Sequence, residues 1–162
     1  MKRVRGLLSH GLIAYSMRKG IPSLWSPPLR RARVARLATI DKRGRPHAVP
    51  VCFVYDGRAF HIALDMKPKK VPLERLARVQ NIAANPRVAL LVDQYREDWG
   101  RLWYLLIRGR ARLLVRESDA RRRKAIRALR HKYPQYRAGL LPDGAPVIRI
   151  VPDRITAWGN PF

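Results

Sequence analysis

The stretch DMKPKKV (Asp65–Val71) places three lysines, Lys67, Lys69 and Lys70, between an apolar run and a segment with helical periodicity. A strand end that leads into a helix offers unpaired backbone N–H groups and the positive end of the helix dipole, which suit a phosphate. The lysines add charge there, and two prolines restrict the loop, which lowers the entropy lost on binding. One interpretation is a phosphate site; the other is a solvated basic turn in a very basic chain.

Other chemistry is sparse. The sequence has no glycine-rich phosphate loop, no dinucleotide fingerprint and no His-Glu-x-x-His motif. Its four histidines are scattered, and its single cysteine excludes a cysteine-rich metal site. We therefore nominate no catalytic side chain and no metal site, and expect that any enzymatic reactive group arrives with a cofactor.

The charge balance is extreme, with 35 Lys and Arg against 11 Asp and Glu, a formal charge of +24. Such a surface suits a polyanionic partner: nucleic acid, an acidic membrane or a phosphorylated ligand. The alternative is compositional, since most of the basic residues are arginines spread along the whole chain, as arginine bias or a thermophilic source would produce. The sequence leaves both interpretations open.

The length of 162 residues predicts one domain with an extension. Leu7–Met17 is interpreted as a short amphipathic helix rather than a signal peptide, because Arg18 and Lys19 follow where small cleavage residues should stand. We expect residues 1–30 to form the extension, which ends in an irregular linker, and residues 31–162 to form the main domain.

No segment reaches the roughly 20 apolar residues of a membrane span. We expect a cytoplasmic protein, because one cysteine suits a reducing compartment.

The main domain has a strand-rich pattern interrupted by two helices. Alternating apolar residues and turn signals predict strands at 33–40, 47–54, 59–64, 87–93, 103–115, 145–151 and 154–159. Helical periodicity predicts helices at 72–85 and 118–133, the second with Arg121–Lys124 on its outer side. Pro50 should mark a sheet edge or a bulge, since proline donates no hydrogen bond. This order favours a small antiparallel barrel.

Several motifs in this order resemble the pyridoxamine-phosphate-oxidase-like split-barrel flavoprotein superfamily. They are LAT, then G-x-P with an apolar V-P-V strand, then Asp-Gly, a basic loop and NPRV, over about Ala32–Leu114. The continuation DQYREDWGRLWYLLIRGRARL is similar to the branch of deazaflavin-dependent oxidoreductases that use coenzyme F420. The second strand, AVPVCFV, lacks the Arg and Lys of true pyridoxamine phosphate oxidases, so vitamin B6 oxidation is not expected.

The resemblance implies a mainly β fold, an antiparallel six-stranded split barrel of the FMN-binding type. It implies a homodimer with FMN or coenzyme F420 at the subunit interface, and hydride transfer from the reduced cofactor to a small electron-poor substrate. The residues that match phosphate contacts are Lys67, Lys69 and Lys70. Those that match the strands beside the ring are Thr39, His47, Val49, Pro50 and Val51.

Two alternatives stay open. The arginines at 108, 110 and 112 share one face of a strand, and a solvated face is favoured over a contact to the anionic tail of a deazaflavin. The chain could also be a non-catalytic anion-binding barrel, with nucleic acid or haem as the ligand. Nucleic acid is the less favoured partner, because the basic runs are not interleaved with the exposed aromatic residues that single-strand binders use.

Overall fold

A computed structural model describes residues 13–16, 20–65, 72–116 and 118–161 of the chain. Lys67, Lys69 and Lys70 thus lie outside the described residues. The strands are β1 Ile13–Ser16, β2 Ala35–Ile40, β3 Pro46–Val51, β4 Phe53–Tyr55, β5 Phe60–Ala63, β6 Arg87–Gln94, β7 Trp103–Leu114 and β8 Val147–Gly159. The helices are α1 Ser26–Arg31, α2 Ala77–Ala84 and α3 Ala120–Lys132, with 3-10 turns η2 Ser23–Trp25, η3 Leu73–Arg75, η4 Trp99–Arg101 and η5 Pro134–Arg137.

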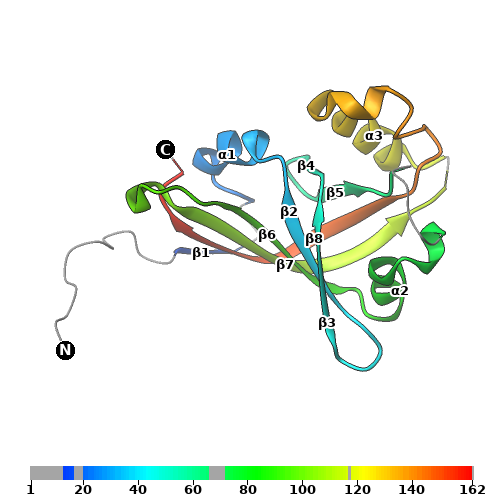
Figure 1. Cartoon of the computed structure of the whole chain (residues 1–162), viewed down its shortest axis with the longest axis horizontal. Helices are drawn as coiled ribbons and strands as arrows, with labels where there is room; N and C mark the ends of the chain where they lie inside the picture. Colours follow the sequence, from blue (N-terminus) through cyan, green and yellow to red (C-terminus); the bar gives the residue numbers. More distant parts are fainter. Residues whose placement is uncertain (1–12, 17–19, 66–71, 117, 162) are drawn as a thin grey trace.

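The strands form one antiparallel sheet in the order β3-β2-β6-β7-β8-β5-β4, with β1 added along β8. The two ends of this order, β3 and β4, are consecutive in the chain and separated only by Cys52. A sheet whose two edge strands are neighbours in sequence must curl, and the long strands β7 and β8 cross the whole molecule (Figure 1). The expected mainly β, antiparallel split barrel is confirmed.

The described part of the chain has eight strands, two more than the six expected. One is β1, and the other arises because the strand predicted at 47–54 is divided into β3 and β4. The division is required by closure: β3 pairs with β2 at one edge, while β4 pairs with β5 at the other. The backbone N–H of Phe53, just past the break, donates to the hydroxyl of Tyr133.

Two strands predicted near the C-terminus are instead one, β8. Its register against β7 shifts where Arg108 faces Arg154 and Gly109 faces Pro152, so one extra residue is accommodated as a bulge. A side chain at Gly109 could not fit, because its Cβ would lie 2.3 Å from the carbonyl oxygen of Val151. The bulge therefore lets a proline sit inside a continuous strand.

The amphipathic helix predicted for Leu7–Met17 is wrong over its described part. Ile13–Ser16 forms β1, which pairs with Arg154–Ala157 of β8. Beyond the segment of β8 that β5 covers, that edge offers unpaired backbone groups, and pairing with β1 satisfies them. The predicted irregular linker contains η2 and α1, whose Trp25 and Leu29 belong to the barrel core.

The two predicted helices exist with altered ends. The first begins as the 3-10 turn η3, and the extended backbone of Leu76 separates it from α2. The second is α3, where Asp119 caps the N-terminus by accepting a hydrogen bond from the backbone N–H of Arg121 at 2.9 Å. Arg122, expected on the outer side, is buried. Its position follows from the face that α3 turns toward the sheet.

The core has two parts. One fills the barrel between the strands, with α1 and the start of α2 at its margins. The other lies between α3 and the outer face of the short strands β4 and β5 (Figure 1). In β7 the predicted alternation is observed, with the apolar face buried and Arg108, Arg110 and Arg112 exposed.

Candidate functional site

The described residues that were predicted to line a cofactor site lie on the paired strands β2 and β3. Thr39 and His47 are cross-strand partners, so their side chains lie on the same face of the sheet. Val49 and Val51 follow on that face and pack in the barrel core. Pro50 is exposed on the opposite face of β3, and the prediction that it marks a sheet edge is confirmed.

Thr39 is bound by a residue of α2 that the sequence did not single out. The side-chain amide of Asn81 donates to the hydroxyl oxygen of Thr39 at 2.9 Å, and both residues are buried. Beside Thr39, the ring nitrogen Nδ1 of His47 is enclosed and has no hydrogen-bond partner among the described residues. A buried polar atom of this kind calls for a partner such as a water or a ligand.

Arg78, also on α2, is a second residue that the sequence did not single out. It stands three residues before Asn81, a spacing that puts both on one side of α2. The Nε of Arg78 is enclosed without a partner in the described part of the chain. Burial lowers the pKa of Arg78, and the carboxylate of Asp65 opposes that effect.

Asp65 is the last described residue before the lysine-rich segment, and it connects this region to η5, the turn that follows α3. The hydroxyl of Tyr136 donates to Oδ2 of Asp65 at 2.9 Å, and both groups are buried. Burial, followed by the neighbouring Cys52 and Asp65, raises the pKa of Tyr136, so its hydroxyl stays protonated. The end of β5, which leads into the loop, is therefore fixed in position.

We call His47, Thr39, Asn81, Arg78 and Asp65 the Thr39 cluster. It offers hydrogen-bond donors and acceptors and one guanidinium, but no cysteine or serine nucleophile. Such a set suits binding of a polar or anionic ligand rather than covalent catalysis. Among the described residues there is no group of three or more His, Cys, Asp or Glu side chains arranged to hold a metal ion.

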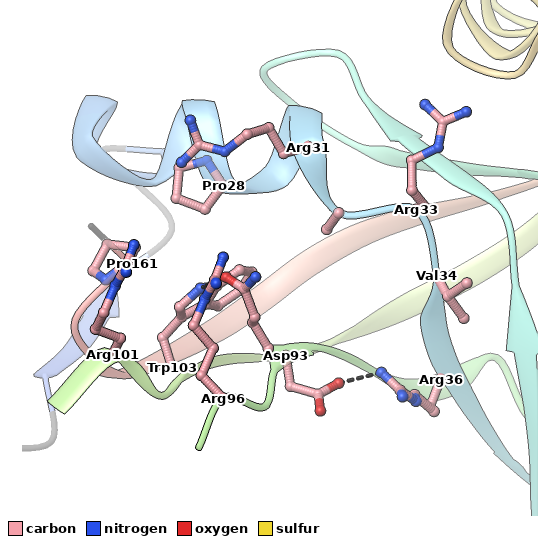
Figure 2. A pocket seen from close by; sticks show the side chains of 12 residues that line it. Pro28, Arg31, Arg33, Val34, Arg36, Asp93, Arg96, Arg101, Trp103 and Pro161 are labelled. Carbon is pink, nitrogen blue, oxygen red and sulfur yellow. Dashed lines mark hydrogen bonds and ion pairs between the residues drawn. The ribbon is translucent and has the colours of Figure 1, made fainter. Parts of the chain in front are cut away.

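A separate pocket of about 610 Å³ lies at the other end of β2, between α1 and the end of β6 (Figure 2). Its lining contains none of the residues predicted for the cofactor site. Arg36 and Asp93 form an ion pair across it, and Arg33 points away from that pair toward α3, where it covers the ring of Tyr133. Arginines at 31, 96 and 101 give the pocket a positive lining.

Trp103 forms one wall of this pocket. Its indole N–H donates to the side chain of Gln94 at 2.9 Å, and its ring meets Trp25 edge to face at 5.8 Å between centroids. With one face packed in the barrel core, Trp103 acts here as a rigid part of the sheet.

No helix in the described part of the chain has the length and apolar character needed to cross a membrane.

This architecture is a split β-barrel, and comparison with family models identifies the family to which the chain belongs. The chain belongs to the pyridoxamine 5'-phosphate oxidase family, whose model matches residues 25–159. The predicted resemblance is thereby confirmed at the level of the family. No curated protein matches the chain in sequence.

Solved structures share the fold. The haem storage protein HutZ of Vibrio cholerae superposes with a TM-score of 0.67 and 16% identity, over 83% of this chain and 92% of its own. An F420 reductase gives 0.58 and 20%, over 83% and 98%. A FAD-binding protein of Mesorhizobium loti gives 0.57 and 23%, over 91% and 97%. At these identities the likeness establishes the fold alone.

Proposed function

We propose that this protein is an oxidoreductase that uses FMN or the deazaflavin coenzyme F420 and reduces a small electron-poor substrate. The observation that carries the proposal is that two enclosed polar atoms of the Thr39 cluster, Nδ1 of His47 and Nε of Arg78, have no hydrogen-bond partner among the described residues. His47 lies on the strand that the family resemblance assigns to the cofactor ring, and Arg78 lies one helical turn before Asn81, which binds Thr39.

The residues of the Thr39 cluster fit such a cofactor. Arg78 supplies a fixed charge with donors on one side of α2, suited to a phosphate at the end of β5. Lys67, Lys69 and Lys70 complete this phosphate site in the proposal, since they follow Asp65 closely in the sequence. When bound, the ring would carry the hydride, while His47 and the backbone of Val49–Val51 orient it.

The test is a cofactor titration of the purified chain and two arginine variants. FMN and coenzyme F420 are titrated separately, and quenching of cofactor fluorescence is followed. Arg78→Ala should weaken binding of the preferred cofactor about tenfold or more, because a charge-assisted contact to phosphate is lost. Arg75→Ala removes the same charge from the exposed face of η3 and should change affinity less than about twofold.

Two results would contradict the proposal. Binding of neither cofactor would remove the redox function, and equal weakening by both variants would remove the assigned site. Haem is titrated in parallel by its absorbance, because the alternative of a non-catalytic haem-binding barrel predicts binding of haem and no binding of FMN or F420.

The proposal includes a homodimer located in the cytoplasm. Val34 and Ile40 lie on the outer side of the β2 segment and are 42% and 40% exposed, which leaves apolar surface for a partner. A second copy of the chain is the proposed partner. Light scattering of the purified protein should give twice the mass of 18.7 kDa, and a monomer at micromolar concentration would contradict the dimer. A cytoplasmic location agrees with the single cysteine.

A further inference from the structure

A buried arginine on α3 lies in a pocket separate from the Thr39 cluster. The pocket has a volume of about 500 Å³, and Arg122, Arg123, Arg127 and Arg130 line one side of it. These arginines sit at helical spacings that place them along one side of α3. Asp143, from the turn before β8, is the acidic residue in the lining.

Arg122 is only 2% exposed, and it is poorly satisfied for a buried guanidinium. Its Nη1 donates one long hydrogen bond of 3.4 Å to the carbonyl oxygen of Ala145. Its Nε is enclosed and has no partner in the described part of the chain. A guanidinium has five N–H donors and stays charged, so burying it without a negative partner is costly.

The acid in the pocket does not compensate this charge. Oδ1 of Asp143 lies 2.8 Å from Nη1 of Arg130, and the Asp143 side chain is 91% exposed. Arg130 also donates from Nε and Nη2 to the carbonyl oxygen of Leu141, at 2.9 and 2.6 Å. Asp143 therefore serves Arg130, while Arg127 adds a further positive charge at the exposed rim.

We propose that this pocket binds the phosphate group of inorganic phosphate or of a small phosphorylated molecule. Phosphate oxygens match the planar fork of a guanidinium and would use the donors that Arg122 leaves unpaired. The negative charge would also reduce the repulsion among neighbouring arginines of α3. The volume falls within the range of small-molecule sites. A recessed guanidinium favours a small ligand over a polymer, whose backbone phosphates lie along an extended surface.

The test uses inorganic phosphate and calorimetry at constant ionic strength, with sodium chloride as the balancing salt. Wild-type protein should bind one phosphate per chain at the α3 site, and Arg78→Ala should retain that binding because it alters only the Thr39 cluster. Arg122→Met, which keeps the apolar stem, and Arg127→Ala should each weaken it about tenfold. Arg121→Ala removes a charge from the same helix outside this pocket and should leave the affinity within about twofold.

Arg127 is exposed, so its variant tests the site even if Arg122→Met does not fold. Weak, non-saturating binding that is equal in all variants would overturn the proposal, because it would be general attraction to a chain of charge +24. Loss of binding in Arg121→Ala as large as in Arg127→Ala would also overturn it. If Arg127→Ala weakens binding of a short duplex DNA while phosphate does not bind the wild type, the surface would be assigned to nucleic acid instead.

Discussion

The hydroxyl of Tyr133 accepts a hydrogen bond from the backbone N–H of Phe53 at 3.0 Å. The same hydroxyl lies 3.0 Å from the carbonyl oxygens of Phe53 and Arg33, so its proton also has an acceptor. Burial raises the pKa of Tyr133 to about 12, which keeps the group protonated at neutral pH. One side chain at the end of α3 thus satisfies the backbone where the chain changes from one sheet edge to the other.

Removing this hydroxyl should destabilise the fold. Tyr133→Phe leaves the buried N–H of Phe53 without its acceptor, and we expect a loss of about 1–3 kcal/mol in the free energy of unfolding, measured with urea. Tyr95→Phe is the control, because the Tyr95 side chain is 64% exposed and its hydroxyl donates only a long hydrogen bond of 3.4 Å to the carboxylate of Glu97. Equal losses in the two variants would mean that the junction between β3 and β4 does not depend on the hydroxyl of Tyr133.

The bond between Asn81 and Thr39 should show as energetic coupling between α2 and β2. In a double-mutant cycle with Asn81→Leu and Thr39→Val, we expect a coupling of about 0.5–1.5 kcal/mol, since each single variant strands a buried partner. The measurement is urea unfolding of the four proteins. Additive losses would contradict the bond, and each variant is also titrated with the cofactors to separate stability from binding.

The sequence was sufficient for features set by local pattern. The alternation along β7 predicted its buried and exposed faces, and the turn at Asp56–Gly57 predicted the β4–β5 hairpin. Features set by distant contacts were not predictable. At the break at Cys52 the backbone N–H of Phe53 bonds Tyr133, which is 80 residues away, and β1 pairs with an otherwise open edge of β8.

The candidate site was predictable only in part for the same reason. The strand motifs placed Thr39 and His47 together, because a hairpin fixes which residues face each other. The contacts of Arg78 and Asn81 depend on how α2 is oriented against the sheet, which the sequence pattern did not define. The signal available in the sequence was that Arg78 and Asn81 are three residues apart, which places both on one side of a helix. The burial of Arg122 likewise depends on the face that α3 presents to the sheet.

Acid should destabilise the fold through His61. Its side chain is 2% exposed, and its Nε2 lies 2.8 Å from Oδ2 of Asp56. Burial lowers the pKa of His61, Asp56 opposes this, and Arg149 and Lys124 add to it. The unfolded chain then binds a proton more readily, so stability falls as pH drops from about 6.5 toward the lowered pKa. His61→Gln should remove this part of the urea-midpoint change between pH 7.5 and 5, whereas exposed His131→Gln should not. An unchanged profile in His61→Gln would contradict the assignment.

Raising the pH above about 8 should stabilise the fold through Lys132. Its Nζ donates to the carbonyl oxygen of Leu29 at 3.1 Å and lies 3.9 Å from the ring centroid of Phe53. Burial, with help from Arg33, lowers its pKa from 10.5 to about 8. Below pH 8 both states carry the charge, and the folded state bears the full cost of burying it. Between pH 8 and 10.5 the folded state loses its proton first, so stability rises with pH.

The measurement compares wild-type protein with Lys132→Met by urea unfolding from pH 7 to 10.5, both in a Cys52→Ala background, which removes the neighbouring thiol. The wild type should gain stability relative to the variant across this window, because methionine has no proton to lose. Lys124→Met, at an exposed position of the same helix, should give a difference from the wild type that is constant with pH. A constant difference for Lys132→Met as well would mean that the ammonium is solvated or compensated, and that α3 packs against α1 without burying a charge.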